Sequence, residues 1–295
     1  RDRDVTGVQT CALPICGEYA VMGILGGALK GNTSITSIGA PTVADIGPSA
    51  FQGCTSLASA DMPNVREIGP SAFQGCTSLA LGDFPKAILV GDLAFQGCTS
   101  LASAEFPWAT HLGKRSFESC GELLSASIPL VTTIGEGAFR DCVKLASVDM
   151  QNVLFLRSGA FGYCSALTEA EMPKAIDLGA DAFRECAALK SVTMPLVETI
   201  GEYAFIGCSA LEKVDLPMAT EMGQQAFAVC KSLWKVSIPK VGKIPFGAFG
   251  NCTSLLDMTI SDSVSTVGEY AFYKCDELNI IRVVGDEATD YSSLL

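Results

Sequence analysis

The chain has 295 residues, of which 48% are hydrophobic and 18% are charged. Its 32 acidic and 20 basic residues give a net charge of −12, which argues against nucleic-acid binding because phosphate contacts need a basic surface. The single histidine, His111, excludes most Ser-His-Asp triads and nearly every zinc site that uses histidine. No apolar run reaches the roughly 18 residues of a membrane-spanning helix.

The first segment, residues 1–16, is unlike the rest of the chain. Residues 5–15 read VTGVQTCALPI, and this stretch resembles a translated sequencing adapter joined to a coding fragment. A genuine N-terminal strand is the alternative. We expect an artefact and exclude residues 1–16 from the prediction of the fold, as one does for an expression tag.

One repeated unit fills the chain from residue 28 to residue 284, after a degenerate segment at 17–27. Cysteine recurs every 22 residues from Cys54 to Cys252, and Cys275 follows after 23. Each of these cysteines has a phenylalanine three residues before it and a leucine three residues after it. Leu29 and Asn32 hold the Phe and Cys positions of a degenerate first copy. The spacing predicts about twelve coils of 22 residues, stacked at intervals of about 4.8 Å.

Each unit divides into parts with different expected structures. Residues 145–150, LASVDM, alternate between apolar and polar side chains, which predicts a half-buried strand. A proline follows this strand in eight units and is expected to end it, because proline has no N–H. The pair Ile134-Gly135 predicts a tight bend, where glycine accepts conformations that other residues avoid. We expect the residues from Gly135 to Cys142 to form one short helical turn.

The pattern A-F-x-x-C-x-x-L-x-x-[IV]-x-[IM]-P-x-x-[IV]-x-x-I-G resembles the BspA-like class of leucine-rich repeats. The resemblance covers residues 28–284. It implies a leucine-rich-repeat solenoid with a parallel β-sheet on the concave face and short helical turns and extended segments elsewhere. It also implies an exported or surface-attached protein, often an adhesin for host matrix proteins, and therefore an extracellular or cell-surface location.

The repeated cysteines admit three interpretations. Disulfides between neighbouring coils fit the spacing of the Cα atoms, but parallel Cβ vectors make such bridges awkward. A zinc site needs four converging ligands, commonly in C-x-x-C motifs, which the chain lacks. We therefore expect free thiols that pack in the core as small hydrophobic groups, and we expect neither a metal site nor a cofactor.

Two side chains of every strand are expected to point out of the concave face. They form a serine column and an acidic column over the first two thirds of the chain, and the last strands are mixed or basic. We interpret the acidic column as a site for a cationic partner, either a basic peptide or divalent cations. The alternative is a solvated face that keeps an apolar solenoid soluble. The candidate ligand-binding residues are Asp61, Asp83, Glu105, Asp149, Glu171, Asp215, Ser59, Ser103, Ser125 and Ser147.

The chain offers little that points to catalysis. His111 is expected in a connecting loop, and the sequence has neither a phosphate-binding glycine loop nor a nucleophile elbow. Trp108 and Trp234 are expected to pack at coil edges rather than to stack on sugars.

We therefore predict a non-catalytic binding module of a cell-surface or secreted protein. Its concave face would recognise a protein, such as a host matrix protein, or a glycan. A spacer rod that projects another domain and has no ligand of its own is the alternative. Residues 285–295 form a C-terminal tail, and we expect the chain to be truncated at both ends.

Overall fold

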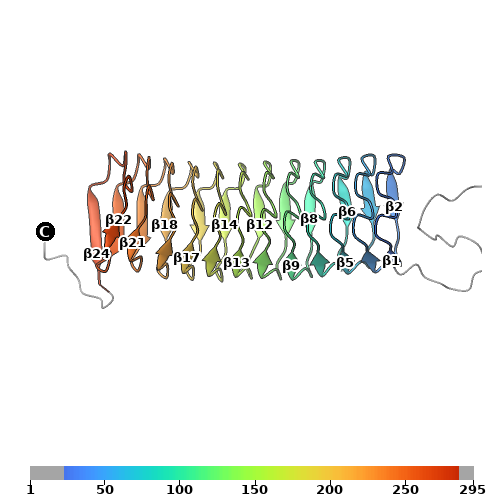
Figure 1. Cartoon of the computed structure of the whole chain (residues 1–295), viewed down its shortest axis with the longest axis horizontal. Helices are drawn as coiled ribbons and strands as arrows, with labels where there is room; N and C mark the ends of the chain where they lie inside the picture. The colour runs from blue at the N-terminus through green and yellow to red at the C-terminus, as the bar shows by residue number, and fades with distance from the viewer. Residues whose placement is uncertain (1–22, 286–295) are drawn as a thin grey trace, which may run out of the picture.

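The computed structural model of the protein describes residues 23–285. Two classes of strand alternate along the chain, and their pairings are parallel. Figure 1 shows the coils stacked in a single row, with the N-terminal coils at one end and the C-terminal coils at the other. The predicted adapter-derived segment, residues 1–16, lies outside the described residues, as does most of the predicted tail.

Each coil contributes one longer strand and one strand of two residues. The longer strands are β2 (Ser37–Gly39), β4 (Ser59–Asp61), β6 (Leu81–Asp83), β8 (Ser103–Glu105), β10 (Ser125–Ser127), β12 (Ser147–Asp149), β14 (Glu169–Glu171), β16 (Ser191–Thr193), β18 (Lys213–Asp215), β20 (Lys235–Ile238), β22 (Asp257–Ser261) and β24 (Ile280–Val284). The short strands are β1 (Gly23–Ile24), β3 (Asp45–Ile46), β5 (Glu67–Ile68), β7 (Leu89–Val90), β9 (His111–Leu112), β11 (Thr133–Ile134), β13 (Phe155–Leu156), β15 (Asp177–Leu178), β17 (Thr199–Ile200), β19 (Glu221–Met222), β21 (Lys243–Ile244) and β23 (Thr266–Val267).

The register of the strands follows the repeat of the sequence. Ala126 of β10 lies opposite Val148 of β12, one 22-residue unit later. Asp257 of β22 lies opposite Ile280 of β24, after the single 23-residue step. β2 pairs with β4, so the degenerate first copy also forms a coil, and β1 pairs with β3 ahead of it. The predicted parallel solenoid of about twelve coils is confirmed.

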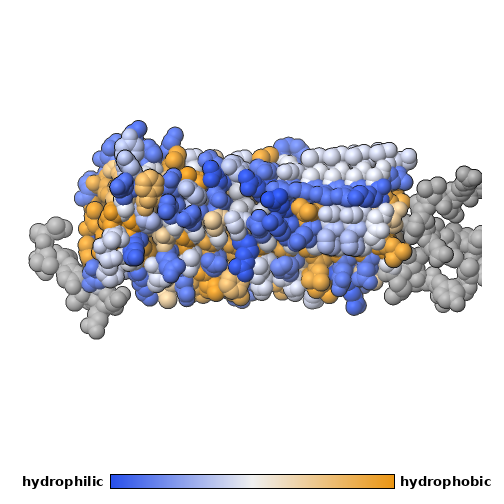
Figure 2. Space-filling view, viewed as in Figure 1, coloured by the Kyte–Doolittle hydropathy of each residue, from blue (hydrophilic) through white to orange (hydrophobic). Residues whose placement is uncertain are grey.

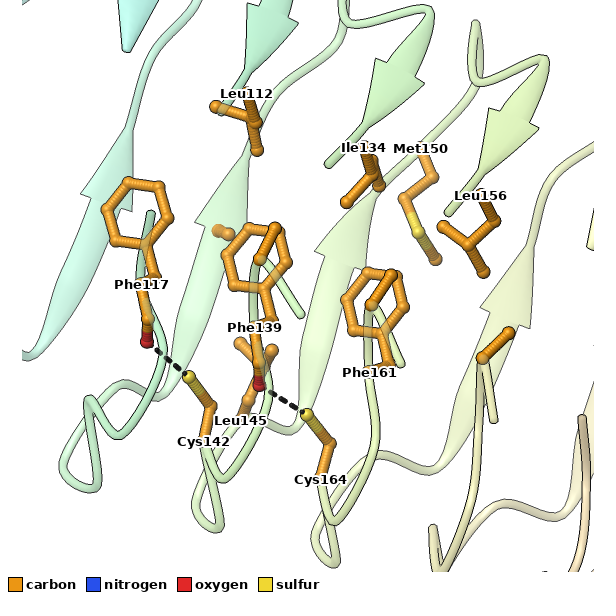
Figure 3. Packing of buried hydrophobic residues seen from close by; sticks show 14 of the residues in the cluster. Leu112, Phe117, Ile134, Phe139, Cys142, Leu145, Met150, Leu156, Phe161 and Cys164 are labelled. Atoms are coloured by element: carbon orange, nitrogen blue, oxygen red, sulfur yellow. Dashed lines mark hydrogen bonds between the residues drawn. The ribbon is translucent and has the colours of Figure 1, made fainter. Parts of the chain in front are cut away.

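A continuous phenylalanine ladder fills the centre of the stack. Successive rings are nearly parallel, with centroids 5.0–5.7 Å apart and interplanar angles of 2–9°. Figure 3 shows three of these rings, Phe117, Phe139 and Phe161, at the same place in successive coils. A single coil cannot bury such a side chain, so each coil depends on its neighbours for its core. The ladder consists of Phe51, Phe73, Phe95, Phe117, Phe139, Phe161, Phe183, Phe205, Phe227, Phe249 and Phe272.

The predicted helical turn before each cysteine is wrong, because residues 23–285 contain turns there and no helix. Alternate N–H groups donate in different directions. The Arg140 N–H donates within the coil to the Gly137 carbonyl at 3.1 Å, and the Phe139 N–H donates to Ala160 of the next coil at 2.8 Å. Gly137 and Asp141 also have φ values of +60° and +59°, which a right-handed helix does not allow. The stacking of coils therefore uses the N–H groups that a helix would need.

The bend glycine is required for a different reason from the one predicted. Gly135 is not among the residues with positive φ, but a Cβ atom there would lie 2.6 Å from the backbone carbonyl carbon of Gly113 in the preceding coil. Close approach of two backbones, rather than an unusual φ, excludes a side chain. The left-handed positions lie further along each unit, and residues other than glycine often occupy them, including Val229 with φ +63°.

The sheet of short strands has one interruption. Its first ten strands, from β1 to β19, form one continuous sheet, and β21 and β23 form a separate pair. Gly223, directly after β19, donates its N–H to Ile200 of the preceding coil at 2.8 Å. Pro245 holds the equivalent position after β21 and has no N–H to donate. The interruption therefore lies where the repeat exchanges glycine for proline.

Candidate functional site

The outward side chains of the longer strands form one surface, which we call the strand face. In β8, β14 and β18 the middle residue is buried and both flanking residues are exposed, as the alternation of the sequence predicts. The structure places all ten predicted ligand-binding residues on this face. The exposed ones are Asp61, Asp83, Glu105, Asp149, Glu171, Asp215, Ser103 and Ser147, and the half-buried ones are Ser59 and Ser125.

We call the six carboxylates among these residues the acidic column. Asp61 and Asp83 lie in register on paired strands, and Ser127 lies between Glu105 and Asp149. The pairing of the longer strands is interrupted between β6 and β8, between β12 and β14, and between β16 and β18. The first two gaps separate acidic neighbours, but Asp61 and Asp83 are acidic neighbours on paired strands, so repulsion between like charges does not explain where the gaps lie.

The negative charge of the acidic column is not compensated locally. Within residues 23–285, none of its six carboxylates forms an ion pair. The same residues contain no group of three His, Cys, Asp or Glu side chains placed to share a metal ion.

The C-terminal end of the strand face has a different character. Its surface is hollowed over β18, β20 and β22, with a volume of about 380 Å³. The ammonium group of Lys213 lies 4.8 Å from the centroid of the Trp234 ring. Sequence reasoning placed Trp234 at a coil edge and did not select the lysines, although Lys213 and Lys235 visibly replace the serines of earlier coils. The hollow is lined by Lys213, Val214, Asp215, Trp234, Lys235, Ser237 and Thr259.

A buried carboxylate lies beside this hollow. Asp257 is 7% exposed and forms ion pairs with Lys235, at 3.6 Å, and with Arg282. The hydrogen bond from Arg282 is the main cause of a lowered pKa for Asp257, and the positive charges of Arg282 and Lys235 add to it. This cluster joins β20, β22 and β24 and holds Lys235 in place at the edge of the hollow.

The repeated cysteines lie in the core as free thiols, as predicted. Each thiol lies within hydrogen-bonding distance of a carbonyl of the preceding coil: Cys142 Sγ is 3.1 Å from Phe117 O, and Cys164 Sγ is 3.1 Å from Phe139 O (Figure 3). Burial raises the pKa of Cys76 to about 12 and raises that of Cys164 far above its ordinary value. Such thiols are poor nucleophiles and poor metal ligands. Their role is to pack in the core and to donate weak hydrogen bonds to backbone carbonyls.

The prediction that His111 lies in a connecting loop is wrong. It is the first residue of β9, where it is exposed and lies in register with Leu89 and Thr133 of the neighbouring coils. Within the part of the chain that the structure describes, no other histidine accompanies it. This arrangement gives His111 no catalytic partner among those strand neighbours.

The protein-family model described as "BspA type Leucine rich repeat region (6 copies)" matches residues 27–146, 89–196 and 176–290 of the sequence. The chain belongs to the BspA-type leucine-rich repeat family. This fold is in general a repeat scaffold without enzymatic activity. No helix within residues 23–285 is long and apolar enough to cross a membrane.

Solved structures of bacterial leucine-rich repeat proteins are similar to this BspA-type solenoid. A protein from Bacteroides ovatus is 25% identical, with a TM-score of 0.65, and the match covers 86% of this chain and 83% of that one. A protein from Eubacterium ventriosum is 20% identical, with a TM-score of 0.51, over 85% and 74% of the two chains. A leucine-rich cell surface protein from Faecalibacterium prausnitzii is 22% identical, with a TM-score of 0.41, over 90% and 84%. No curated protein matches the chain.

Proposed function

We propose that this BspA-type repeat region is a non-catalytic binding module of a cell-surface or secreted protein. Its strand face recognises a partner protein through the acidic column, and the partner supplies a basic segment. The observation that carries the proposal is the row of six exposed carboxylates without an ion pair inside residues 23–285. Opposite charges across an interface speed the encounter and select the partner.

A family argument supports the extracellular location. The chain belongs to the BspA-type repeat family, and the resemblance to BspA-like proteins implies an exported or surface-attached protein, often an adhesin. Host matrix proteins are therefore the first partners to test. Glycans are the second class, since serine hydroxyls lie beside the carboxylates on the same face.

The test uses immobilised matrix proteins and a double charge reversal, Asp83→Lys with Glu105→Lys. These residues lie on β6 and β8 and are the second and third carboxylates of the acidic column. Binding to any matrix protein that the wild type captures should weaken about tenfold or more in the double variant. Glu198→Lys with Glu202→Lys is the matched control, because both residues are exposed, lie outside the longer strands and change the net charge equally. Equal binding by both double variants would remove the acidic column as the recognition surface.

The alternative function is a spacer rod, which the regular row of coils in Figure 1 also suits. A shortened chain separates the two functions. Deleting residues 125–146 and 191–212 removes two whole repeats and leaves all six carboxylates of the acidic column in place. A spacer should tolerate both charge reversals, but the shortened chain should hold an attached domain at a smaller distance. A binding module should instead lose affinity for its partner when the charges on the strand face are reversed.

A further inference from the structure

The hollow at the C-terminal end of the strand face has the size of a ligand site. Its volume of about 380 Å³ lies within the roughly 300–1,000 Å³ typical of small-molecule sites. It lies over β18, β20 and β22 and includes Asp215, the last carboxylate of the acidic column, whereas Asp83 and Glu105 lie far from it on β6 and β8. Figure 2 shows that the surface also becomes less uniform toward the C-terminal coils, where hydrophobic residues appear between hydrophilic ones.

The charges in the hollow are not all engaged. The Lys235 ammonium is held by Asp257 at 3.6 Å, but Lys213 forms no ion pair with any residue between 23 and 285. Lys213 is exposed and lies over the Trp234 ring, where the ring quadrupole favours a cation. In a protein of net charge −12, this lysine provides a local positive charge for an anionic group.

The other lining groups favour a ligand that has hydroxyl groups. The Asp215 carboxylate only accepts hydrogen bonds, while the hydroxyls of Ser237 and Thr259 both donate and accept. The indole of Trp234 adds a flat apolar surface. A carboxylate group alone would pair with Lys213 but has no donor for Asp215, and hydroxyl groups on the same ligand supply that donor.

Trp234, Lys213 and Lys235 hold surface positions that vary from coil to coil. The position of Trp234 is alanine at Ala58, Ala80 and Ala102 and changes to Leu124, Thr168, Lys190 and Glu212 in other coils, and among residues 23–285 tryptophan occurs there only at Trp234. The core residues of these coils keep the repeat pattern, with Phe205, Phe227, Cys208 and Cys230 all buried. The core is therefore unchanged at the coils where Trp234 and the two lysines lie together on the surface.

We propose that this hollow binds an acidic sugar, a residue of a glycan that carries a carboxylate on a hydroxyl-rich ring. Lys213 pairs with the carboxylate, Asp215 and the two hydroxyls bond the sugar hydroxyls, and Trp234 contacts the ring face. The inference rests on the proposed function, because it assigns a glycan ligand to the same strand face.

Isothermal titration calorimetry of the full chain tests the proposal with two probes, a galacturonic acid tetrasaccharide and the neutral galactose tetrasaccharide. Short probes are chosen because the acidic column would repel a long polyanion. The acidic probe should bind, and the neutral probe should bind about tenfold more weakly or not at all. Lys213→Gln should weaken the acidic probe by about tenfold, whereas Lys174→Gln should leave it unchanged. Lys174 is a matched control because it is an exposed lysine on another surface, bonded to Asn152.

Trp234→Ala should also weaken the acidic probe. Trp234 is half-buried, so circular dichroism must first show that this variant is folded. If the variant does not fold, the result for Lys213→Gln decides, because Lys213 is exposed. No binding, equal binding of both probes, or full affinity in Lys213→Gln would overturn the proposal. Asp83→Lys with Glu105→Lys should leave the tetrasaccharide bound. A chain that captures a matrix protein through the acidic column but ignores the acidic probe would refute only this inference.

Discussion

Replacing Phe161 by alanine removes one ring from the middle of the phenylalanine ladder. Phe161 is fully buried, and its ring lies 5.2 Å from Phe139 and 5.5 Å from Phe183. The neighbouring rings have little freedom to fill the gap, because each coil is fixed by backbone bonds such as Phe161 N–H to Ala182 O at 2.8 Å. We therefore expect a loss in the free energy of unfolding near the upper end of the roughly 3–5 kcal/mol measured for such substitutions.

Phe272→Ala is the matched control for this prediction. Phe272 is only half-buried and stacks on one neighbour in the ladder, Phe249, at 5.7 Å. We expect its replacement to cost about half as much, since it buries less surface and leaves a gap that solvent reaches.

Urea unfolding measures both variants, with circular dichroism for the whole chain and tryptophan fluorescence for its two halves. Trp108 and Trp234 lie on either side of Phe161, so variants with a single tryptophan report on each side separately. Separate transitions in Phe161→Ala would show that the lost ring uncouples neighbouring coils, as a nearest-neighbour stack allows. An unchanged midpoint for Phe161→Ala, or an equal loss for Phe272→Ala, would refute the reasoning.

Three further predictions follow from buried polar groups. Ser116 is fully buried with no partner for its hydroxyl and stands where ten other units have alanine, so Ser116→Ala should raise the free energy of unfolding by about 1–2 kcal/mol. The reciprocal change Ala138→Ser should lower it, and a stabilising effect there would contradict this account. In thiol titration without reductant, the ten buried cysteines from Cys54 to Cys252 should stay unlabelled in the native protein and react on denaturation, and a shortfall after denaturation would reveal disulfides. Because the folded pKa of Asp257 is lowered, its stabilising effect is present above its unfolded pKa of about 3.9 and is lost as the pH falls through the folded value. Wild type should thus lose more stability below about pH 4 than Asp257→Asn, and parallel pH profiles would contradict this assignment.

The sequence by itself determines the coil, its length and its buried residues. Phe, Cys and Leu recur at fixed positions, so the core of one unit predicts the core of every other, and the stack follows because no single unit can bury these side chains. The outward positions of Asp61, Asp83 and Glu105 follow equally from the alternation of the strand.

Only the tertiary structure decides how the coils contact one another. The turn before each cysteine is not helical because alternate N–H groups bond to the next coil, and Gly135 is needed because the backbone of Gly113 approaches it. Stacking also brings Lys213 over Trp234 and Arg282 onto Asp257. These pairs lie 21 and 25 residues apart in the chain, so no local pattern shows that their side chains meet. The hollow is visible only when neighbouring coils are in place, since each coil supplies only part of its lining.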